Sequence, residues 1–212
     1  MAAQPRKTEA LLFDFGNVLV DIDFRRAFDV WARAAGVPAS EIARRFAFNA
    51  AYEAHELGKL EAAEYHAAVR EALSTDLSYD AFLAGWNAIF VQPREGMERL
   101  LPALAAAMPL YLFSNTNALH HAYWSAEYRE LLKSFSGIYC SHQISARKPA
   151  AEAFRIVAEN IGLPPTRIAF FDDLLENVEG ARTAGMTGFH ITALPELRSA
   201  LRSLNIATPD DG

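Results

Sequence analysis

Short apolar segments that end abruptly at polar residues recur along the chain. Five of these segments have the length and composition of buried strands: Ala10–Phe15, Leu110–Phe113, Ile138–Cys140, Ile168–Phe171 and Gly188–Ile191. The helical stretches that alternate with the later segments are Leu119–Phe135, Ala150–Ile161, Leu174–Ala184 and Pro195–Leu204. Strands that alternate with helices predict a doubly wound, Rossmann-like α/β fold, in which a parallel five-stranded sheet carries helices on both faces.

The connection between the first two predicted strands is too long for a simple crossover. It runs from Asp14 to Leu110, whereas about a dozen residues suffice to connect two parallel strands. The intervening sequence has helical periodicity, with Asp23 and Ser78 as N-caps and Gly58 as a helix end. An insertion of several helices therefore separates the two strands.

Aromatic residues are spread across this insertion and give it enough apolar surface for a core of its own. They are Phe28, Trp31, Phe46, Phe48, Tyr52, Tyr65, Phe82, Trp86 and Phe90. We expect residues 22–92 to form a helical-bundle cap. Residues 8–21 and 93–207 then form the α/β core.

Composition and charge narrow the class of protein. The 212 residues are 51% hydrophobic and 22% charged, as in ordinary globular proteins, and the net charge of −6 with no basic block argues against a nucleic-acid partner. No apolar run reaches the length of a membrane span, and the N-terminal residues lack a signal-peptide pattern, so we expect a cytoplasmic protein without a membrane partner. Cys140 is the only cysteine, which excludes an internal disulfide and a CxxC site.

The ends of the predicted strands carry the candidate chemistry, because ligands of an open parallel sheet bind at the carboxyl ends of its strands. These ends are polar: Asp14 follows the first strand, Ser114 and Asn115 the second, Lys148 comes after the third, and Asp172 and Asp173 follow the fourth. Carboxylates that converge on one crevice repel each other unless a cation lies between them, and their oxygens suit Mg²⁺. A hydroxyl, an amide and a lysine beside that ion form a receptacle for a phosphate group.

Four motifs in order and spacing resemble a known family. FDFGNVLV, LFSNTN, RKPAAEAF and FFDDLLENVEGARTAG are similar to the four motifs of the haloacid dehalogenase-like hydrolase superfamily, over essentially the whole chain. DFGNVLVDIDF and YEAHELGKLEAAEY are most similar to bacterial sugar-phosphate phosphatases such as α-D-glucose-1-phosphate phosphatase. The resemblance implies a Mg²⁺-dependent phosphoric monoester hydrolase that acts on a small phosphorylated metabolite.

The resemblance also implies a role for each motif residue. Asp14 is the expected nucleophile, which forms an aspartyl-phosphate that water then hydrolyses. The expected Mg²⁺ ligands are Asp14, the carbonyl of Gly16 and Asp173, with Asp172 joining directly or through water. The expected phosphate ligands are Ser114, Asn115 and Lys148.

Contacts to the rest of the substrate are less constrained by the sequence. The candidates are Asn117, His55, Asp21 and Asp23. Each has a structural alternative, because Asp21 and Asp23 also suit a turn and a helix cap, and His55 stands among aromatic residues that suit a core. The sequence leaves these alternatives open, and it does not fix the oligomeric state.

Gly16 departs from the family pattern. Most phosphatases of the superfamily have a second aspartate at this position, which serves as a general acid and base, and such help is worth about 10²–10⁴-fold in rate. One compensation is a good leaving group, which favours a sugar 1-phosphate over a sugar 6-phosphate. Another is a substitute acid, with Asp21, Asp23 and His55 as candidates.

Two other functions fit parts of the sequence. A 2-haloacid dehalogenase also uses an aspartate nucleophile without the second aspartate, but it needs no metal and has an arginine just after the nucleophile, which is missing here. A non-catalytic phosphometabolite-binding module would explain Gly16 as a degraded site. The retained Asp14, Lys148 and acidic pair Asp172–Asp173 favour the phosphatase over both alternatives.

Overall fold

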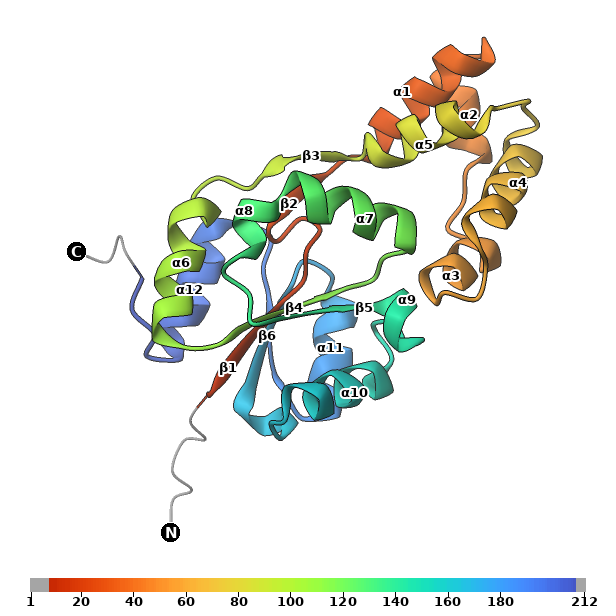
Figure 1. The fold of residues 1–212 in the computed structure, drawn as a ribbon. Coiled ribbons are helices and arrows are strands. Elements are labelled where there is room, and N and C mark those ends of the chain that lie inside the picture. The colour runs from red at the N-terminus through yellow and green to blue at the C-terminus, as the bar shows by residue number, and fades with distance from the viewer. Residues whose placement is uncertain (1–7, 209–212) are drawn as a thin grey trace.

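A parallel sheet lies at the centre of the computed structural model, which describes residues 8–208. Its strands, in the spatial order β5-β4-β1-β6-β7, all run parallel to their neighbours (Figure 1). They are β1 (Ala10–Phe13), β4 (Leu110–Ser114), β5 (Gly137–Cys140), β6 (Ile168–Asp172) and β7 (Thr187–His190). The prediction of a doubly wound, five-stranded α/β fold is confirmed.

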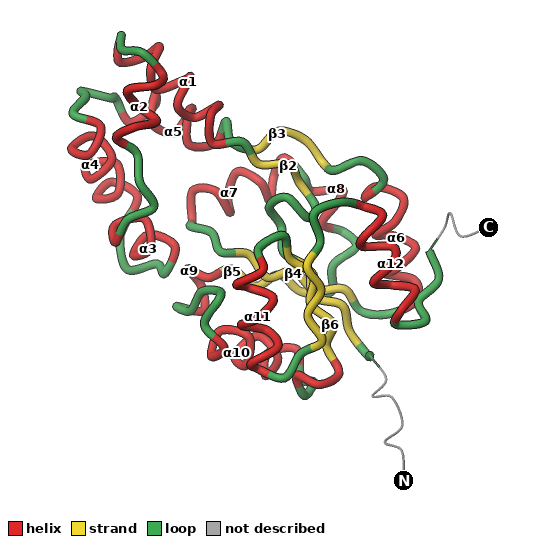
Figure 2. The backbone as a smooth tube through the Cα atoms, turned by 180° about the vertical axis from the view of Figure 1, so that it is seen from behind, coloured by secondary structure: helices red, strands yellow, loops and turns green. Residues whose placement is uncertain are grey.

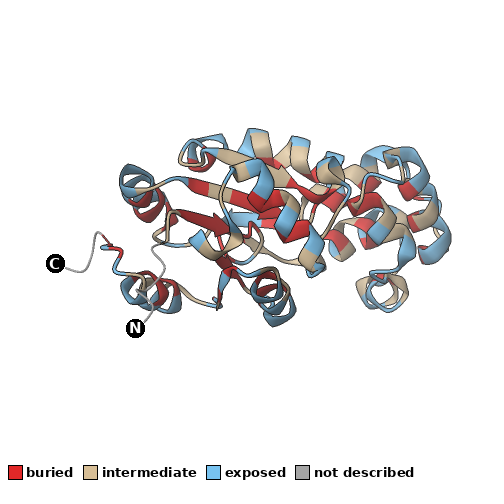
Figure 3. Cartoon of the chain, turned by 90° about the horizontal axis from the view of Figure 1, so that it is seen from below, coloured by how far each residue is buried: buried red, intermediate tan, exposed pale blue. Residues whose placement is uncertain are grey.

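Both faces of the sheet are covered by helices, because the side chains of β1 alternate between two apolar cores. Leu11 and Phe13 belong to one core and Ala10 and Leu12 to the other, and all four are fully buried. The helices of the first face are α6 (Met97–Ala107), α7 (Ala118–Glu127), α8 (Arg129–Leu132) and α12 (Leu194–Ser203). Those of the second face are α10 (Ala151–Ile161) and α11 (Leu175–Ala184). Figure 3 shows the buried strands between these exposed helix surfaces.

Five helices of the insertion lie between β2 (Val20–Ile22) and β3 (Phe90–Pro93), on the way from β1 to β4. They are α1 (Phe24–Ala35), α2 (Ala39–Arg45), α3 (Ala50–Glu56), α4 (Ala62–Leu73) and α5 (Tyr79–Asn87). Figure 2 shows them together at one end of the molecule, joined to the sheet by two neighbouring segments. These segments, β2 and β3, form a small antiparallel pair. The indoles of Trp31 and Trp86, stacked with centroids 6.1 Å apart, are fully buried among these helices.

Several element boundaries differ from those expected from the sequence. The helix expected over Leu119–Phe135 is divided at Tyr128 into α7 and α8. Helix α6, the pair β2–β3, the single turn α9 (Ser141–Ile144) and the 3₁₀ turn Pro165–Arg167 were not expected. These elements are short or lie at junctions, where tertiary contacts outweigh the local sequence pattern. Among residues 8–208, no helix is long and apolar enough to cross a bilayer.

Candidate active site

The carboxyl ends of the neighbouring strands β4, β1 and β6 bring the predicted motif residues together around one cavity of about 420 Å³. Its wall includes Asp14, Ser114, Asn115, Lys148 and Asp173. We call the group Asp14, Lys148, Asp172 and Asp173 the catalytic end of the cavity. A second group that lines this cavity, Phe48, Tyr52, Glu56 and Arg147, is the cap end.

Lys148 holds the catalytic end together. Its ammonium group donates to Asp14 Oδ1 at 2.5 Å and to Asp172 Oδ2 at 2.7 Å, and the side chain is 1% exposed. Burial by itself lowers the pKa of Lys148, but Asp14 and Asp172 raise it above its usual value, so the lysine stays charged. Burial raises the pKa of Asp14 to about 7, opposed by Lys148 and reinforced by Asp172.

Asp172 is fully buried and both of its carboxylate oxygens accept hydrogen bonds from the protein. Asn177 Nδ2 donates to them at 3.0 and 3.1 Å, and the backbone N–H of Leu174 donates at 2.8 Å. Together with the bond from Lys148, these contacts leave Asp172 oriented toward the lysine. Asp172 therefore orients Lys148 and tethers the start of α11 to the end of β6.

The catalytic end has the composition of a cation site. Carboxylate oxygens of Asp14, Asp172 and Asp173 all lie within 4.8 Å of one another. Burial and the neighbouring Asp172 raise the pKa of Asp173, whose Oδ2 accepts from Asn17 Nδ2 at 3.2 Å. Clustered carboxylates of this kind favour a hard divalent cation such as Mg²⁺. Because Asp172 is already bonded on both oxygens, Asp14 and Asp173 are the carboxylates best suited to face that ion.

Of the expected phosphate ligands, Asn115 makes contacts that the sequence did not indicate. Its Nδ2 donates to the carbonyl of Lys148 and its Oδ1 accepts from the N–H of Lys148, both at 2.9 Å. This pair of bonds fixes the backbone that carries the lysine. Ser114 lines the cavity, and its hydroxyl donates to the carbonyl of Asn115 over a long 3.4 Å.

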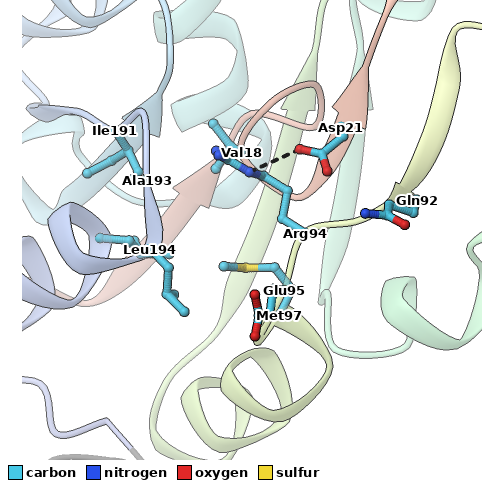
Figure 4. A pocket seen from close by; sticks show the side chains of 10 residues that line it. Val18, Asp21, Gln92, Arg94, Glu95, Met97, Ile191, Ala193 and Leu194 are labelled. Atoms are coloured by element: carbon cyan, nitrogen blue, oxygen red, sulfur yellow. Dashed lines mark ion pairs between the residues drawn. The ribbon is translucent and has the colours of Figure 1, made fainter.

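The structure places two of the four candidate substrate residues, Asp21 and Asp23, away from the cavity wall. Asp23 is the N-cap of α1 and pairs with Arg25. Asp21 lies in a second cavity of about 310 Å³, where Arg94 Nε is 3.3 Å from its Oδ1, as Figure 4 shows. Arg94 also donates to the carbonyls of Asn17 and Thr192, so it joins the β3 end to the turn after β1.

The other two candidates are packed among aromatic rings and also do not line the cavity. His55 is buried, with Nδ1 2.9 Å from the Leu60 carbonyl and its ring stacked on Tyr65. Asn117 is the N-cap of α7, and its Oδ1 accepts from the N–H of His120 at 3.0 Å. His55 thus has the contacts of a residue in an aromatic core, the structural alternative considered for it, and Asn117 has those of a helix cap.

The cap end contains residues that the sequence did not single out as ligands. Arg147 Nη2 is 2.9 Å from Glu56 Oε2, and Arg147 Nη1 is 3.1 Å from Glu53 Oε1. In the sequence, these residues are marked only by their neighbours: Arg147 directly precedes Lys148, and Glu56 directly follows His55. Neither signal shows that a loop of the core and a helix of the insertion meet at this cavity.

Comparison with known proteins agrees with this fold. A sequence model of the haloacid dehalogenase-like hydrolase family matches residues 8–185. The chain belongs to that family, so the predicted superfamily is confirmed, and so is the prediction of an enzyme.

Two proteins with similar sequences are phosphatases. The chain is 24% identical to a D-ribitol-5-phosphate phosphatase of Bacteroides thetaiotaomicron over 84% of its own length and 89% of the relative. It is 27% identical to a phosphatase of Mycobacterium tuberculosis, over 91% of each chain. A crystal structure of a Bacteroides thetaiotaomicron enzyme of the same family, in complex with magnesium and inorganic phosphate, superposes with a TM-score of 0.74 at 25% identity, covering 86% of this chain and 93% of that one. These relatives support a phosphoric monoester hydrolase.

Proposed function

We propose that the protein is a Mg²⁺-dependent phosphatase that hydrolyses a small sugar or polyol phosphate through an aspartyl-phosphate. The observation that carries the proposal is the position of Asp14, which ends the central strand, lines the cavity and lies beside both Lys148 and Asp173. A binding module has little need of a nucleophile in this place. The phosphatase relatives and the magnesium and phosphate in the related crystal structure support the same activity.

Catalysis proceeds in two displacements at phosphorus. A carboxylate oxygen of Asp14 attacks the phosphorus atom, the new Asp14–phosphate bond forms, and the bond to the leaving oxygen breaks. Water then attacks the same phosphorus, which releases inorganic phosphate and restores the carboxylate. Lys148 offsets the negative charge that builds up on the phosphoryl oxygens, and Ser114 holds one of these oxygens.

Asp14, the carbonyl of Gly16 and Asp173 are the groups that would hold Mg²⁺, since Asp172 is already bonded on both oxygens. The ion supplies neutralisation of the phosphate charge and orientation of the phosphoryl group toward the nucleophile. Asn17, which bonds Asp173, fixes the direction of that carboxylate.

The absence of an acidic side chain at Gly16 favours a particular kind of leaving group. A Cβ atom at Gly16 would lie 3.2 Å from Ile22 Cγ1 and 3.9 Å from Asp14 Oδ2, so this part of the cavity is close to the nucleophile but carries no acid. A substrate whose leaving oxygen departs with little protonation suits such a site. A sugar 1-phosphate has this property, because its anomeric hydroxyl is more acidic than an ordinary alcohol.

The inserted helices define which molecules reach the catalytic end. Residues 22–92 act as a cap, because Phe24, Phe48, Tyr52 and Glu56 of this segment line the cavity. A cavity of about 420 Å³ fits a small phosphorylated metabolite.

A screen of phosphorylated sugars and polyols for release of inorganic phosphate tests the proposal. We expect turnover with Mg²⁺, loss of turnover when EDTA removes the metal, and faster hydrolysis of sugar 1-phosphates than of sugar 6-phosphates. Tight binding of phosphate esters with no turnover would refute the phosphatase in favour of a binding module. Chloride release from a 2-chlorocarboxylic acid without metal would refute it in favour of a dehalogenase.

A further inference from the structure

The cap end of the cavity contains a buried carboxylate with unused bonding capacity. Glu56, the last residue of α3, is 4% exposed and lines the cavity beside Tyr52 and Arg147. The Glu56 Oε2 and Arg147 Nη2 atoms are 2.9 Å apart but are not aligned as a hydrogen bond, and Arg147 Nε also has no partner. Buried polar atoms usually have hydrogen-bond partners, so the bonding of this pair is incomplete. Both unpartnered atoms are enclosed by protein, and a ligand therefore meets the pair through the remaining atoms of these two cavity-lining side chains.

Glu56 is held firmly against the core. Its backbone carbonyl accepts from Ser141 Oγ at 2.7 Å, and the same hydroxyl accepts from the N–H of Thr116 at 2.9 Å. Two residues beyond Glu56, Gly58 has φ +68° and approaches α9 so closely that a Cβ atom would lie 2.5 Å from the His142 carbonyl oxygen. The end of α3 is therefore fixed, and the Glu56 carboxylate keeps a constant position relative to the catalytic end.

The charges at the cap end restrict the ligand that fits there. Arg147 pairs with both Glu53 and Glu56, so this group of three carries one net negative charge when all are ionised. Burial raises the pKa of Glu56, and the arginine opposes this rise. A carboxylated leaving group is disfavoured beside two glutamates. Neutral hydroxyls fit, because each can donate to a carboxylate and accept from a guanidinium group.

We propose that Glu56 and Arg147 form a subsite for the hydroxyl groups of the leaving group and so select polyhydroxylated phosphate esters over alkyl ones. The proposal rests on the proposed phosphatase function, because it requires the phosphate to lie against Lys148, the residue next to Arg147 in the chain. Tyr52 also lines the cavity, and its hydroxyl is the third polar group of the subsite. The subsite recognises the leaving group and takes no part in bond cleavage.

A matched pair of substrates tests the subsite. D-Ribitol 5-phosphate and pentyl phosphate both release a primary alcohol of five carbons, and they differ in their hydroxyl groups. We expect the wild-type enzyme to prefer ribitol 5-phosphate. Glu56→Gln keeps the size of the side chain, and we expect it to lower kcat/KM for ribitol 5-phosphate by about 10–100-fold, mainly through KM, with pentyl phosphate changed by less than about twofold.

Glu53→Gln is the matched control. Glu53 pairs with the same arginine from the same helix, but its side chain is 55% exposed and does not line the cavity. We expect this variant to change kcat/KM for both esters by less than about twofold. Tyr52→Phe is a second test that does not depend on the folding of the Glu56→Gln chain, and we expect it to reduce the preference for ribitol 5-phosphate about tenfold.

Three results would overturn the subsite. They are a wild-type enzyme without preference between the two esters, a Glu56→Gln variant that loses both activities equally, and equal effects of Glu53→Gln and Glu56→Gln. Failure of the proposed function gives a different result, because the wild-type enzyme would then hydrolyse neither ester, nor phenyl phosphate.

Discussion

The two ends of the cavity are built from different parts of the chain. At the catalytic end, residues from adjacent strand ends and from the Lys148 loop form a continuous set of bonds, in which Lys148 donates to Asp14 and Asp172 and Asn177 supports Asp172. At the cap end, a helix of the insertion meets a core loop, and Glu56 and Arg147 retain polar atoms without hydrogen bonds.

This difference separates the groups that take part in bond cleavage from the groups that select the substrate. A group held by such a set of bonds keeps its geometry before any substrate arrives, which is what electrostatic stabilisation of a transition state requires. A pair of cavity-lining side chains with incomplete bonding can form hydrogen bonds with one ligand and not with another, which is what discrimination between ligands requires. Substitutions at the catalytic end should therefore reduce turnover of every phosphate ester, whereas those at the cap end should change the order of preference among esters.

The largest expected effect is at the nucleophile. Asp14→Asn keeps the shape of the side chain and removes the attacking carboxylate, so turnover of phenyl phosphate should fall by about 10⁴-fold or more. Phosphate release with Mg²⁺ measures the loss, and circular dichroism verifies that the variant is folded. A variant that keeps a tenth of the wild-type activity would show that another group attacks phosphorus.

The next largest effect is expected from replacing Lys148, whose ammonium group is buried. Lys148→Met leaves Asp14 and Asp172 buried without their shared partner, so the free energy of unfolding in metal-free buffer should fall by about 3–5 kcal/mol. Turnover should fall by about 10³-fold. Urea unfolding and phosphate release are the measurements.

Lys133→Met is the control for this prediction. Its ammonium group pairs with Glu130 at the surface and its side chain is 64% exposed, so the free energy of unfolding should change by less than about 1 kcal/mol. Equal effects of the two lysine substitutions would contradict the central place of Lys148 in the catalytic end.

Stabilisation by Mg²⁺ should depend on the carboxylates of the catalytic end alone. Mg²⁺ should raise the melting temperature of the wild-type chain, because a ligand at 100 times its Kd stabilises a folded protein by about 2.7 kcal/mol. Asp173→Asn should shift the Mg²⁺ concentration needed for this effect upward by at least about tenfold. Asp80→Asn, at an exposed position in the first turn of α5, is the control and should leave the midpoint unchanged. An unchanged Mg²⁺ midpoint for Asp173→Asn would show that Asp173 is not a metal ligand.

Gly16→Asp should narrow the difference in turnover rate between substrates with good leaving groups and substrates with poor ones. The added carboxyl group would supply the missing general acid, so turnover of pentyl phosphate should rise about tenfold while phenyl phosphate changes little. Gly16→Ala measures the packing cost separately, because its Cβ atom meets Ile22 Cγ1 at 3.2 Å. An equal response of both substrates to Gly16→Asp would contradict the leaving-group explanation for this glycine.

The smallest expected effect is at the rim of the cap end. Phe48 is 60% exposed, contacts the rings of Phe24 and Tyr52, and lines the cavity. Phe48→Ala should raise KM for sugar and polyol phosphates by about two- to fivefold and leave kcat and the melting temperature almost unchanged, because little buried area is lost. Steady-state kinetics and a thermal scan measure both. A fall in kcat for phenyl phosphate would show that this ring also supports the catalytic end.

The fold and the catalytic end could be predicted from the sequence because both depend on local patterns. Short apolar strands alternate with helices, and each strand ends at a polar residue. Parallel strands place these ends at one edge of the sheet. Asp14, Lys148 and Asp173 were therefore expected to lie together, and they do.

Only the tertiary structure decided which neighbouring polar residues face the cavity. Asp23, His55 and Asn117 have suitable chemistry, but Asp23 and Asn117 are helix caps, and His55 is stacked on Tyr65 with its Nδ1 beside the Leu60 carbonyl. Glu56 and Arg147 are separated by ninety positions in the chain, and they meet because Gly58 allows α3 to approach α9 within contact distance. The sequence by itself thus determined the sheet and the order of its strand ends, since these follow from periodicity. The packing of the insertion against the core decided the cap end, because that contact depends on surfaces distant in the chain.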